Sequence, residues 1–224
     1  MLRFPTSAIK GRKHTKTTTF LYSLGIYIPM MDGNRKTEGY KRKTGELALT
    51  EAQVRQLLSV VGRLDHEVLL RIAIELGLRR ADVVKIEQAN IDLRMKRLAY
   101  IETKKGGRIH RVPLSDSLAK LIEQYLNVIG RSRWLFPTPH KTKGHLHDRT
   151  AYDIFNKYLE KAGLPPRPFH ALRATCIKLL QKKGWSIEEV MALTNDSFRT
   201  IKEHYDTPSE EEMHEAAMQK PLFE

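Results

Sequence analysis

The chain has 224 residues, of which 41% are hydrophobic and 29% are charged, a composition that indicates one folded domain or one domain plus an arm. Lys and Arg outnumber Asp and Glu by 39 to 26, and this formal net charge of +13 favours a polyanion as the partner. The single cysteine, Cys176, excludes an internal disulfide and a thiolate zinc site, and no apolar run approaches the roughly 20 residues of a membrane span. We therefore expect a cytoplasmic protein without a secretory signal or a membrane partner.

Residues 1–45 differ in composition from the rest of the chain. They hold ten Lys and Arg against two acidic residues, Asp32 and Glu38, so they carry +8 of the net charge (10 − 2). No hydrophobic period persists there, which predicts a basic, flexible N-terminal arm or linker, or else a cloned leader. We expect residues 46–224 to form the folded domain, with residues 206–224 as its C-terminal tail.

Helical spacing of apolar residues predicts two helices at the start of this domain. The residues Thr50–Gln53 match a capping box, in which the first and fourth residues satisfy each other's backbone N–H groups. The second helix is predicted over Leu64–Leu76 and ends at Gly77.

Two β-strands are predicted next, over Ile91–Thr103 and Arg108–Leu114. The four residues between them, Lys104–Gly107, include two glycines and are typical of a hairpin turn. Most of the remaining chain has helical patterning. The predicted fold class is therefore mainly α with a small antiparallel β-sheet (α+β).

The helices that follow the hairpin are predicted from their caps. One is capped by Ser115 or Ser117 and runs to Val128, and the next is capped by Asp148 and covers residues 149–162. A polar loop is expected between them at His140–His147. Its histidines lack a regular spacing on one element, so we expect them to be solvated and predict no metal site.

The segment from Phe169 to Tyr205 has the clearest chemical pattern. His170 and Arg173 are spaced i and i+3, so they project from one face of a helix start, which suits an oxyanion such as phosphate. A second capping box begins at Ser186, and a short amphipathic helix then leads to Tyr205.

Two further basic residues are placed where they could join this pair. Arg79 follows the glycine that ends a helix, and Lys105 lies in the two-glycine turn. Two arginines, a lysine and a histidine would bracket a phosphodiester, since arginine binds phosphate oxygens with a rigid fork and lysine is a mobile proton donor. A tyrosine can be the covalent nucleophile on phosphorus, and Tyr205 is our candidate. Three other tyrosines have patterns typical of core packing: Tyr100, Tyr152 and Tyr158.

These motifs resemble those of the tyrosine recombinase/integrase family, and the resemblance covers Leu49 to about Glu215. The stretch Gly77–Val83 looks like the first arginine box of that family, with Asp82 in place of a glutamate. The stretch His170–Arg173 is similar to its second box, His-x-Leu-Arg. Lys105 lies eight residues before Pro113, in a hairpin where the family keeps its lysine, and Tyr205 stands where the nucleophile does.

The resemblance implies cutting and rejoining of DNA without a cofactor or a metal. By resemblance, Tyr205 attacks a phosphodiester to form a 3′-phosphotyrosine, while Arg79 and Arg173 stabilise the transition state. His170 would assist proton transfer, and Lys105 would protonate the leaving 5′-oxygen. Further DNA contacts are expected from Arg80, Lys104, Arg108 and Arg199.

The implied partners are double-stranded DNA and further copies of the chain. The family assembles as a tetramer on two recombination sites, with a C-terminal segment packed on a neighbour, for which Met213–Phe223 is the candidate. Such a protein would be associated with the nucleoid.

The sequence departs from the pattern of the family in several places, and Ala174 stands where the family has a His after its second arginine. The family usually has Leu-Gly-His, or Trp for the His, about nine residues before the tyrosine, and here Asn195 or Asp196 takes that position. We expect Asn195 to bind a phosphate oxygen, because an ionised Asp196 has no proton to donate. The 45 residues at the start are too few for the helical core-binding domain of the family, so we expect a truncated catalytic domain or a minimal enzyme. The alternatives are a type IB topoisomerase-like DNA-relaxing enzyme and a catalytically impaired DNA-binding protein.

Overall fold

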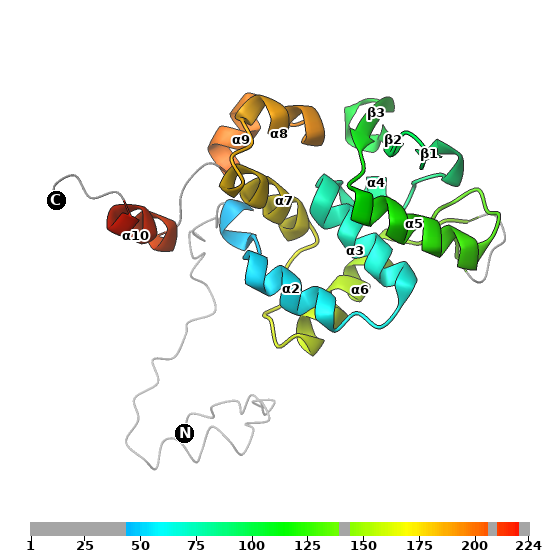
Figure 1. The fold of residues 1–224 in the computed structure, drawn as a ribbon, viewed down its shortest axis with the longest axis horizontal. Helices are drawn as coiled ribbons and strands as arrows, with labels where there is room; N and C mark the ends of the chain where they lie inside the picture. The colour runs from blue at the N-terminus through cyan, green and yellow to red at the C-terminus, as the bar shows by residue number, and fades with distance from the viewer. Residues whose placement is uncertain (1–43, 139–143, 206–209, 220–224) are drawn as a thin grey trace, which may run out of the picture. The chain divides into compact units, whose positions relative to one another are not determined.

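The computed structural model describes residues 44–138, 144–205 and 210–219. The expected basic arm lies outside the described residues up to residue 43, as do residues 139–143 of the polar loop and residues 206–209 and 220–224 of the tail. The elements in chain order are η1 (Thr44–Leu47), α2 (Glu51–Ser59), α3 (Leu64–Leu76), α4 (Arg80–Val83), η2 (Gln88–Asn90), β1 (Ile91–Asp92), β2 (Arg97–Glu102), η3 (Thr103–Lys105), β3 (Arg108–Pro113), α5 (Asp116–Ile129), α6 (Asp148–Lys161), α7 (His170–Lys182), α8 (Ile187–Thr194), α9 (Phe198–His204) and α10 (Glu210–Gln219) (Figure 1). Of the helices in the described ranges, none is long and apolar enough to cross a membrane.

The predicted fold class is confirmed, because helices dominate and the strands form one small antiparallel sheet in the order β1-β2-β3. The prediction of a single strand over Ile91–Thr103 is wrong. The chain turns at residues 93–96, where the Asp92 carboxylate accepts a hydrogen bond from the Met95 backbone N–H at 2.9 Å and Lys96 has a φ of 48°. This local hydrogen bond competes with the strand ladder and divides the stretch into β1 and β2.

Most of the predicted caps are confirmed. Thr50 and Ser186 both form complete capping boxes, and the Ser115 hydroxyl accepts from the Leu118 backbone N–H. The predicted cap of α6 is wrong by one residue. His147, rather than Asp148, is the N-cap, because its ring nitrogen accepts from the Arg149 backbone N–H at 3.1 Å and leaves Asp148 inside the first turn.

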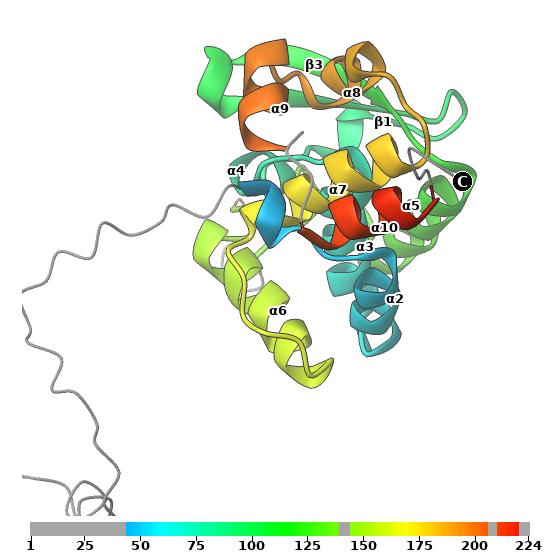
Figure 2. The same cartoon turned by 90° about the vertical axis from the view of Figure 1, so that its left-hand side faces the viewer.

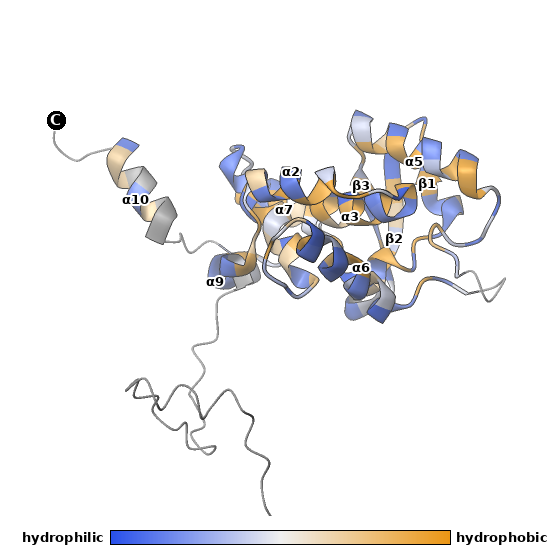
Figure 3. Cartoon of the chain, turned by 90° about the horizontal axis from the view of Figure 1, so that it is seen from below, coloured by the Kyte–Doolittle hydropathy of each residue, from blue (hydrophilic) through white to orange (hydrophobic). Residues whose placement is uncertain are grey.

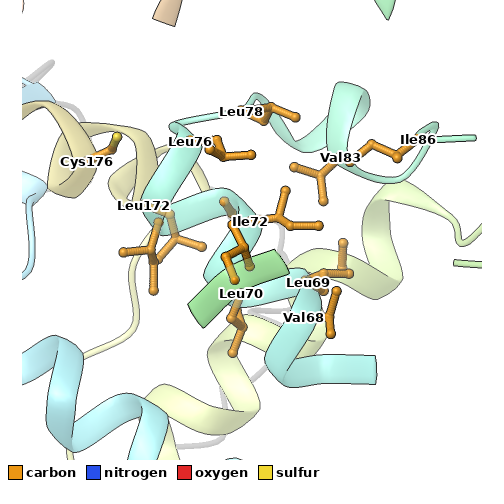
Figure 4. Close-up of a cluster of buried hydrophobic side chains, with 14 of the residues drawn as sticks. Val68, Leu69, Leu70, Ile72, Leu76, Leu78, Val83, Ile86, Leu172 and Cys176 are labelled. Atoms are coloured by element: carbon orange, nitrogen blue, oxygen red, sulfur yellow. The ribbon is translucent and has the colours of Figure 1, made fainter. Parts of the chain in front are cut away.

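Helix α3 is the centre of the main core. It contacts α4, α5, α6 and α7, and seven of its thirteen residues are buried (Figures 1 and 2). Its hydropathy colouring is accordingly mainly orange, whereas that of α5 alternates (Figure 3). Leu172 of α7 lies against this helix near Leu70 and Ile72, and Cys176 lies one turn further along α7 (Figure 4). A helix buried on most of its faces is apolar nearly all round, and it fixes the positions of the helices that cover it.

A second, smaller cluster joins α7 to α8 and α9. Its buried members are Ala174, Ile177, Val190, Ile201 and Tyr205. The side chains at 201 and 205 are four residues apart and therefore lie on one face of the last turn of α9. This packing draws the C-terminal end of α9 onto α7.

Thr175 connects α7 to the chain that enters α2. Its hydroxyl accepts a hydrogen bond from the backbone N–H of Leu49 at 2.8 Å and donates one to the carbonyl of Ala171 at 2.7 Å, and Thr175 itself is fully buried. The Leu49 N–H would be left without this partner if the hydroxyl were removed.

We therefore expect Thr175→Val, which preserves shape, to lower the free energy of unfolding by about 1–3 kcal/mol, the cost of an unsatisfied buried donor. The measurement is urea unfolding followed by circular dichroism. Thr150→Val, at an exposed position of α6, is the matched control and should change the free energy of unfolding by less than about 0.5 kcal/mol. Equal stabilities for the two variants would contradict a structural role for this hydroxyl.

Candidate active site

The guanidinium group of Arg173 is the most deeply buried charge of the predicted site. The side chain is 1% exposed, although it lies in the first turn of α7. Its Nη1 donates to the carbonyl of Gly77 at 2.5 Å, its Nη2 to the carbonyl of Thr194 at 2.6 Å, and its Nε to Oδ2 of Asp196 at 3.0 Å. These acceptors come from the ends of α3 and α8 and from the turn after α8, so the buried charge ties three segments together.

Gly77 is required where α3 meets this guanidinium group. Its φ is 62°, in the left-handed region that favours glycine, and it forms the C-cap of α3. A Cβ atom here would lie 3.2 Å from Sγ of Cys176 and 3.3 Å from Cγ2 of Thr194. Glycine therefore permits both the turn and the close approach of α7 and α8.

Arg79 is held beside the same acceptor. It is the N-cap of α4, its side chain is 18% exposed, and its Nη2 donates to Oδ1 of Asp196 at 3.0 Å. Its Nη1 donates to Oε1 of Glu102, which is fully buried at the end of β2. Burial opposes the charged form, but the hydrogen bond to Glu102 and the charge of Asp196 outweigh it and raise the pKa of Arg79.

Asp196 therefore bridges the two arginines, with one carboxylate oxygen on each guanidinium group. The neighbouring Asn195 adopts φ 52° as the C-cap of α8, and its Nδ2 donates to the second oxygen of Glu102 at 2.5 Å. Of the two residues considered for this position, it is thus Asp196, nine residues before Tyr205, that contacts the arginine pair. The expected contact of Asn195 with phosphate stays a prediction, since its amide is directed to Glu102 here.

Tyr205 and His170 form the other half of the site. The Tyr205 hydroxyl lies 2.8 Å from Nε2 of His170, within hydrogen-bonding distance, and the tyrosine is 2% exposed. Burial and then the charge of Asp196 raise the pKa of Tyr205 to about 12. Partial removal of the imidazole from water and then the charge of Arg173 lower the pKa of His170. At neutral pH the site thus pairs a protonated tyrosine with a neutral histidine.

The position of Tyr205 depends on two contacts. Its ring belongs to the small cluster between α7, α8 and α9, and its backbone is approached by η1. A Cβ atom on Gly45 would lie 3.0 Å from the carbonyl of His204 and 3.3 Å from the Cα of Tyr205. The start of the described chain therefore supports the backbone that carries the candidate nucleophile.

The lysine-bearing turn is anchored to the first arginine box through Asp82. One oxygen of this buried carboxylate accepts from the Thr103 backbone N–H at 3.0 Å and from the Thr103 hydroxyl. Lys104 is exposed, and its charge is among the causes that lower the pKa of His170. The backbone of Lys105 lies in η3, whereas its side chain lies outside the description.

The other predicted DNA contacts differ in exposure and pairing. Arg80 is half-buried and lies 3.8 Å from Asp148, Arg108 is exposed at the start of β3, and Arg199 is exposed and pairs with Glu203 at 2.6 Å. The histidines near α6 have structural contacts: His145 lies 2.8 Å from the carbonyl of Leu146, and His147 is the cap of α6. Within the described ranges, no three His, Cys, Asp or Glu side chains are grouped to hold a metal ion.

Sequence reasoning missed Glu102. A signal was present, because the alternation of β2 places residues 98, 100 and 102 on its buried face, where a glutamate must have a partner. Its two partners, Arg79 and Asn195, come from distant segments, so the sequence did not reveal what the carboxylate binds.

Comparison with known proteins identifies the family and the fold. Residues 48–212 match the model of the phage integrase family. The chain is 26% identical to the tyrosine recombinase XerA of Pyrococcus horikoshii over 227 residues, which covers 95% of this chain and 78% of that protein.

Solved structures share the fold. XerA recombinase superposes with a TM-score of 0.67 at 17% identity over 77% of this chain and 64% of that chain. A post-cleavage complex of XerH with its difH substrate has a TM-score of 0.64 at 17% identity, over 76% of this chain and 52% of that chain. A lambda integrase dimer bound to a core site has a TM-score of 0.58 at 17% identity, over 73% of this chain and 61% of that chain. The chain thus spans less than two thirds of the length of these solved proteins. Because the family model matches most of its length, this chain belongs to the phage integrase family.

Proposed function

We propose that this chain is a site-specific DNA recombinase or integrase that cuts and rejoins DNA through a covalent 3′-phosphotyrosine intermediate. The observation that carries the proposal is the Tyr205 hydroxyl 2.8 Å from a histidine nitrogen, on the same helix start that holds Arg173. A nucleophile, a proton acceptor and two guanidinium groups are the parts that phosphoryl transfer needs.

In the proposed reaction, the Tyr205 oxygen forms a bond to phosphorus and the bond to the 5′-oxygen breaks. His170 accepts the tyrosine proton, which its lowered pKa permits because the imidazole is neutral at pH 7. Arg79 and Arg173 stabilise the negative charge that develops on the phosphoryl oxygens, a role that requires no metal ion in this scheme. The phosphotyrosine conserves the energy of the broken bond, so rejoining uses no nucleotide cofactor.

The 5′-oxygen needs a proton as it leaves, and we propose Lys105 as the donor. Its turn is tied to the first arginine box by the hydrogen bonds between Thr103 and Asp82, which would hold the lysine near the scissile phosphate. The neighbouring Lys104 contributes positive charge that reaches His170. A positive field favours the neutral form of a lysine and makes it a stronger acid.

The proposed partner is double-stranded DNA, with which XerH and lambda integrase were solved. We propose a homo-tetramer on paired sites at the nucleoid, with the C-terminal segment of one copy on its neighbour. An apolar pocket of about 380 Å³ supports this arrangement, because Leu179, Leu180 and Trp185 line it. Helix α10 exposes Met213 and Met218, side chains that such a pocket would accept.

Replacing Tyr205 by phenylalanine should abolish covalent attachment to DNA and leave DNA affinity nearly unchanged. The variant loses the nucleophilic oxygen but keeps the ring in its cluster and every phosphate-binding charge. The measurement is trapping on a nicked suicide substrate, read as an SDS-resistant adduct. An adduct formed by the variant would show that another residue is the nucleophile.

The same substrate separates the proposal from its alternatives. A catalytically impaired DNA-binding protein would shift the DNA in a native gel but give no adduct with the unaltered chain. A topoisomerase-like enzyme would form the adduct and relax supercoiled DNA without exchanging strands between paired sites.

The rate of adduct formation should fall as the pH falls through the pKa of His170. That pKa is lowered from 6.5, so the loss lies on the acid side of this value, where the imidazolium cannot accept the tyrosine proton. Between about pH 7 and pH 8, His170 should contribute no further change. Single-turnover rates for the unaltered chain and for His170→Gln test this, and an identical acid limb in both would exclude His170 as the acceptor.

Lys105→Ala should cleave an ordinary phosphodiester slowly but cleave a 5′-bridging phosphorothiolate nearly as fast as the unaltered chain. A thiolate leaves without protonation, so sulfur restores the step that lacks its acid. Lys104→Ala is the matched control and should behave like the unaltered chain on both substrates. Rescue of the Lys104 variant alone would assign the acid to Lys104, and rescue of neither variant would place it elsewhere.

A further inference from the structure

The carboxylate of Asp196 lies between the two arginines and is bound by both guanidinium groups. Oδ1 accepts from Nη2 of Arg79 at 3.0 Å, while Oδ2 accepts from Nε of Arg173 at 3.0 Å and lies 2.7 Å from its Nη2. The Asp196 side chain is 7% exposed. Two phosphoryl oxygens would use the same pair of guanidinium edges, since a carboxylate and a phosphate present their oxygens alike to an arginine fork.

Most of the other N–H groups of Arg173 face the protein. Its other two hydrogen bonds are made to the backbone carbonyls of Gly77 and Thr194, which hold it from the protein side, and it is 1% exposed. The edge that carries Nε is the one that Asp196 covers. A phosphodiester that contacts the Nε edge of Arg173 must therefore take the place of Asp196.

The formal charges of the site also favour exchange of Asp196 for a phosphodiester. The two arginines contribute +2, and Asp82, Glu102 and Asp196 contribute −3, so the formal sum of these five side chains is −1 (2 − 3). A phosphodiester added to these five side chains alone would meet a net negative group, and the neighbouring Lys104 offsets one of these charges. A phosphodiester exchanged for Asp196 would replace one monoanion by another and leave both guanidinium groups paired.

We propose that Asp196 is an internal substitute for the scissile phosphate. It holds Arg79 and Arg173 in place while no DNA is bound, and the entering phosphodiester displaces it. This inference rests on the proposed function, since it concerns the same phosphate site. It adds a residue that competes with the substrate at the position where the resembled family has a histidine or a tryptophan.

The turn that carries Asp196 is built so that the displacement reaches the candidate nucleophile. Asn195, the C-cap of α8, precedes Asp196, and Ser197, the N-cap of α9, follows it. Helix α9 then ends at Tyr205, its C-cap. A movement of Asp196 therefore changes the three-residue connection, residues 195–197, on which the orientation of α9 depends. The hydrogen bond from Asn195 to Glu102 helps to hold this connection, together with the contacts of Asp196 to the two arginines.

The test uses inorganic phosphate and the full chain, so it requires neither cleavage nor a nucleophile. Asp196→Asn removes the charge and keeps the shape, while Asp116→Asn removes an exposed charge paired with Lys96 and is the matched control. Thermal unfolding is followed over a phosphate titration, with sodium chloride added to hold the ionic strength constant. Asp196→Asn should unfold at a lower temperature without phosphate and should bind phosphate at least about tenfold more tightly than the unaltered chain, a factor that corresponds to 1.4 kcal/mol.

Two results would overturn the proposal. One is a phosphate affinity of Asp196→Asn equal to that of the Asp116→Asn control, which would mean that the carboxylate does not compete. The other is weaker phosphate binding by Asp196→Asn, which would make Asp196 only a support for the arginines.

A second measurement on the unaltered chain covers the case in which Asp196→Asn does not fold. The Nε–H resonance of Arg173 in a nitrogen-15 spectrum should shift on saturation with phosphate, and an unchanged resonance would refute displacement. These outcomes are independent of the Tyr205→Phe trapping result, so a failure of either idea can be recognised separately.

Discussion

The arrangement of the site depends on the burial of the Arg173 guanidinium group. A buried charge is tolerated only when an opposite charge and good hydrogen bonds replace the lost water. Here the replacements are the carbonyls of Gly77 and Thr194 and the carboxylate of Asp196, which belong to segments far apart in the sequence. The ends of α3 and α8 are therefore positioned by one side chain of α7, and removing any of these acceptors would leave part of that charge unpaired.

The polar groups around this charge form a continuous network. Asp196 connects Arg173 to Arg79, Arg79 connects to Glu102, and Glu102 accepts from Asn195. Such networks are stabilising when their members are satisfied, and one oxygen of the buried Asp82, which has no hydrogen-bond partner among the described residues, is an exception. The donors that stabilise the DNA-free chain are also those a phosphate would need. Under the proposed displacement of Asp196, stability without DNA and affinity for DNA would compete at this point, as is common at functional sites.

The apolar packing has a different role, since it decides where the nucleophile candidate lies. The main core around α3 fixes α7, and the small cluster then fixes α9 against α7. Tyr205 is held through its buried ring, which leaves its hydroxyl to reach His170. Packing thus fixes the position of the Tyr205 ring, and hydrogen bonding fixes the direction of its hydroxyl.

The sequence by itself determined the class of the fold and most helix boundaries, and it predicted Arg79, His170, Arg173 and Tyr205 as one candidate set, because periodicity, caps and motif spacing are local properties. It also placed Glu102 on a buried strand face, although that signal was not used. Only the tertiary structure decided which carboxylate meets which arginine. The choice between Asn195 and Asp196 depends on a backbone φ of 52° at the end of α8, which turns one side chain toward Glu102 and the next toward the arginine pair. The identities of residues 195 and 196 do not predict this backbone turn, because it is fixed by partners on α7 and β2 that come from elsewhere in the chain.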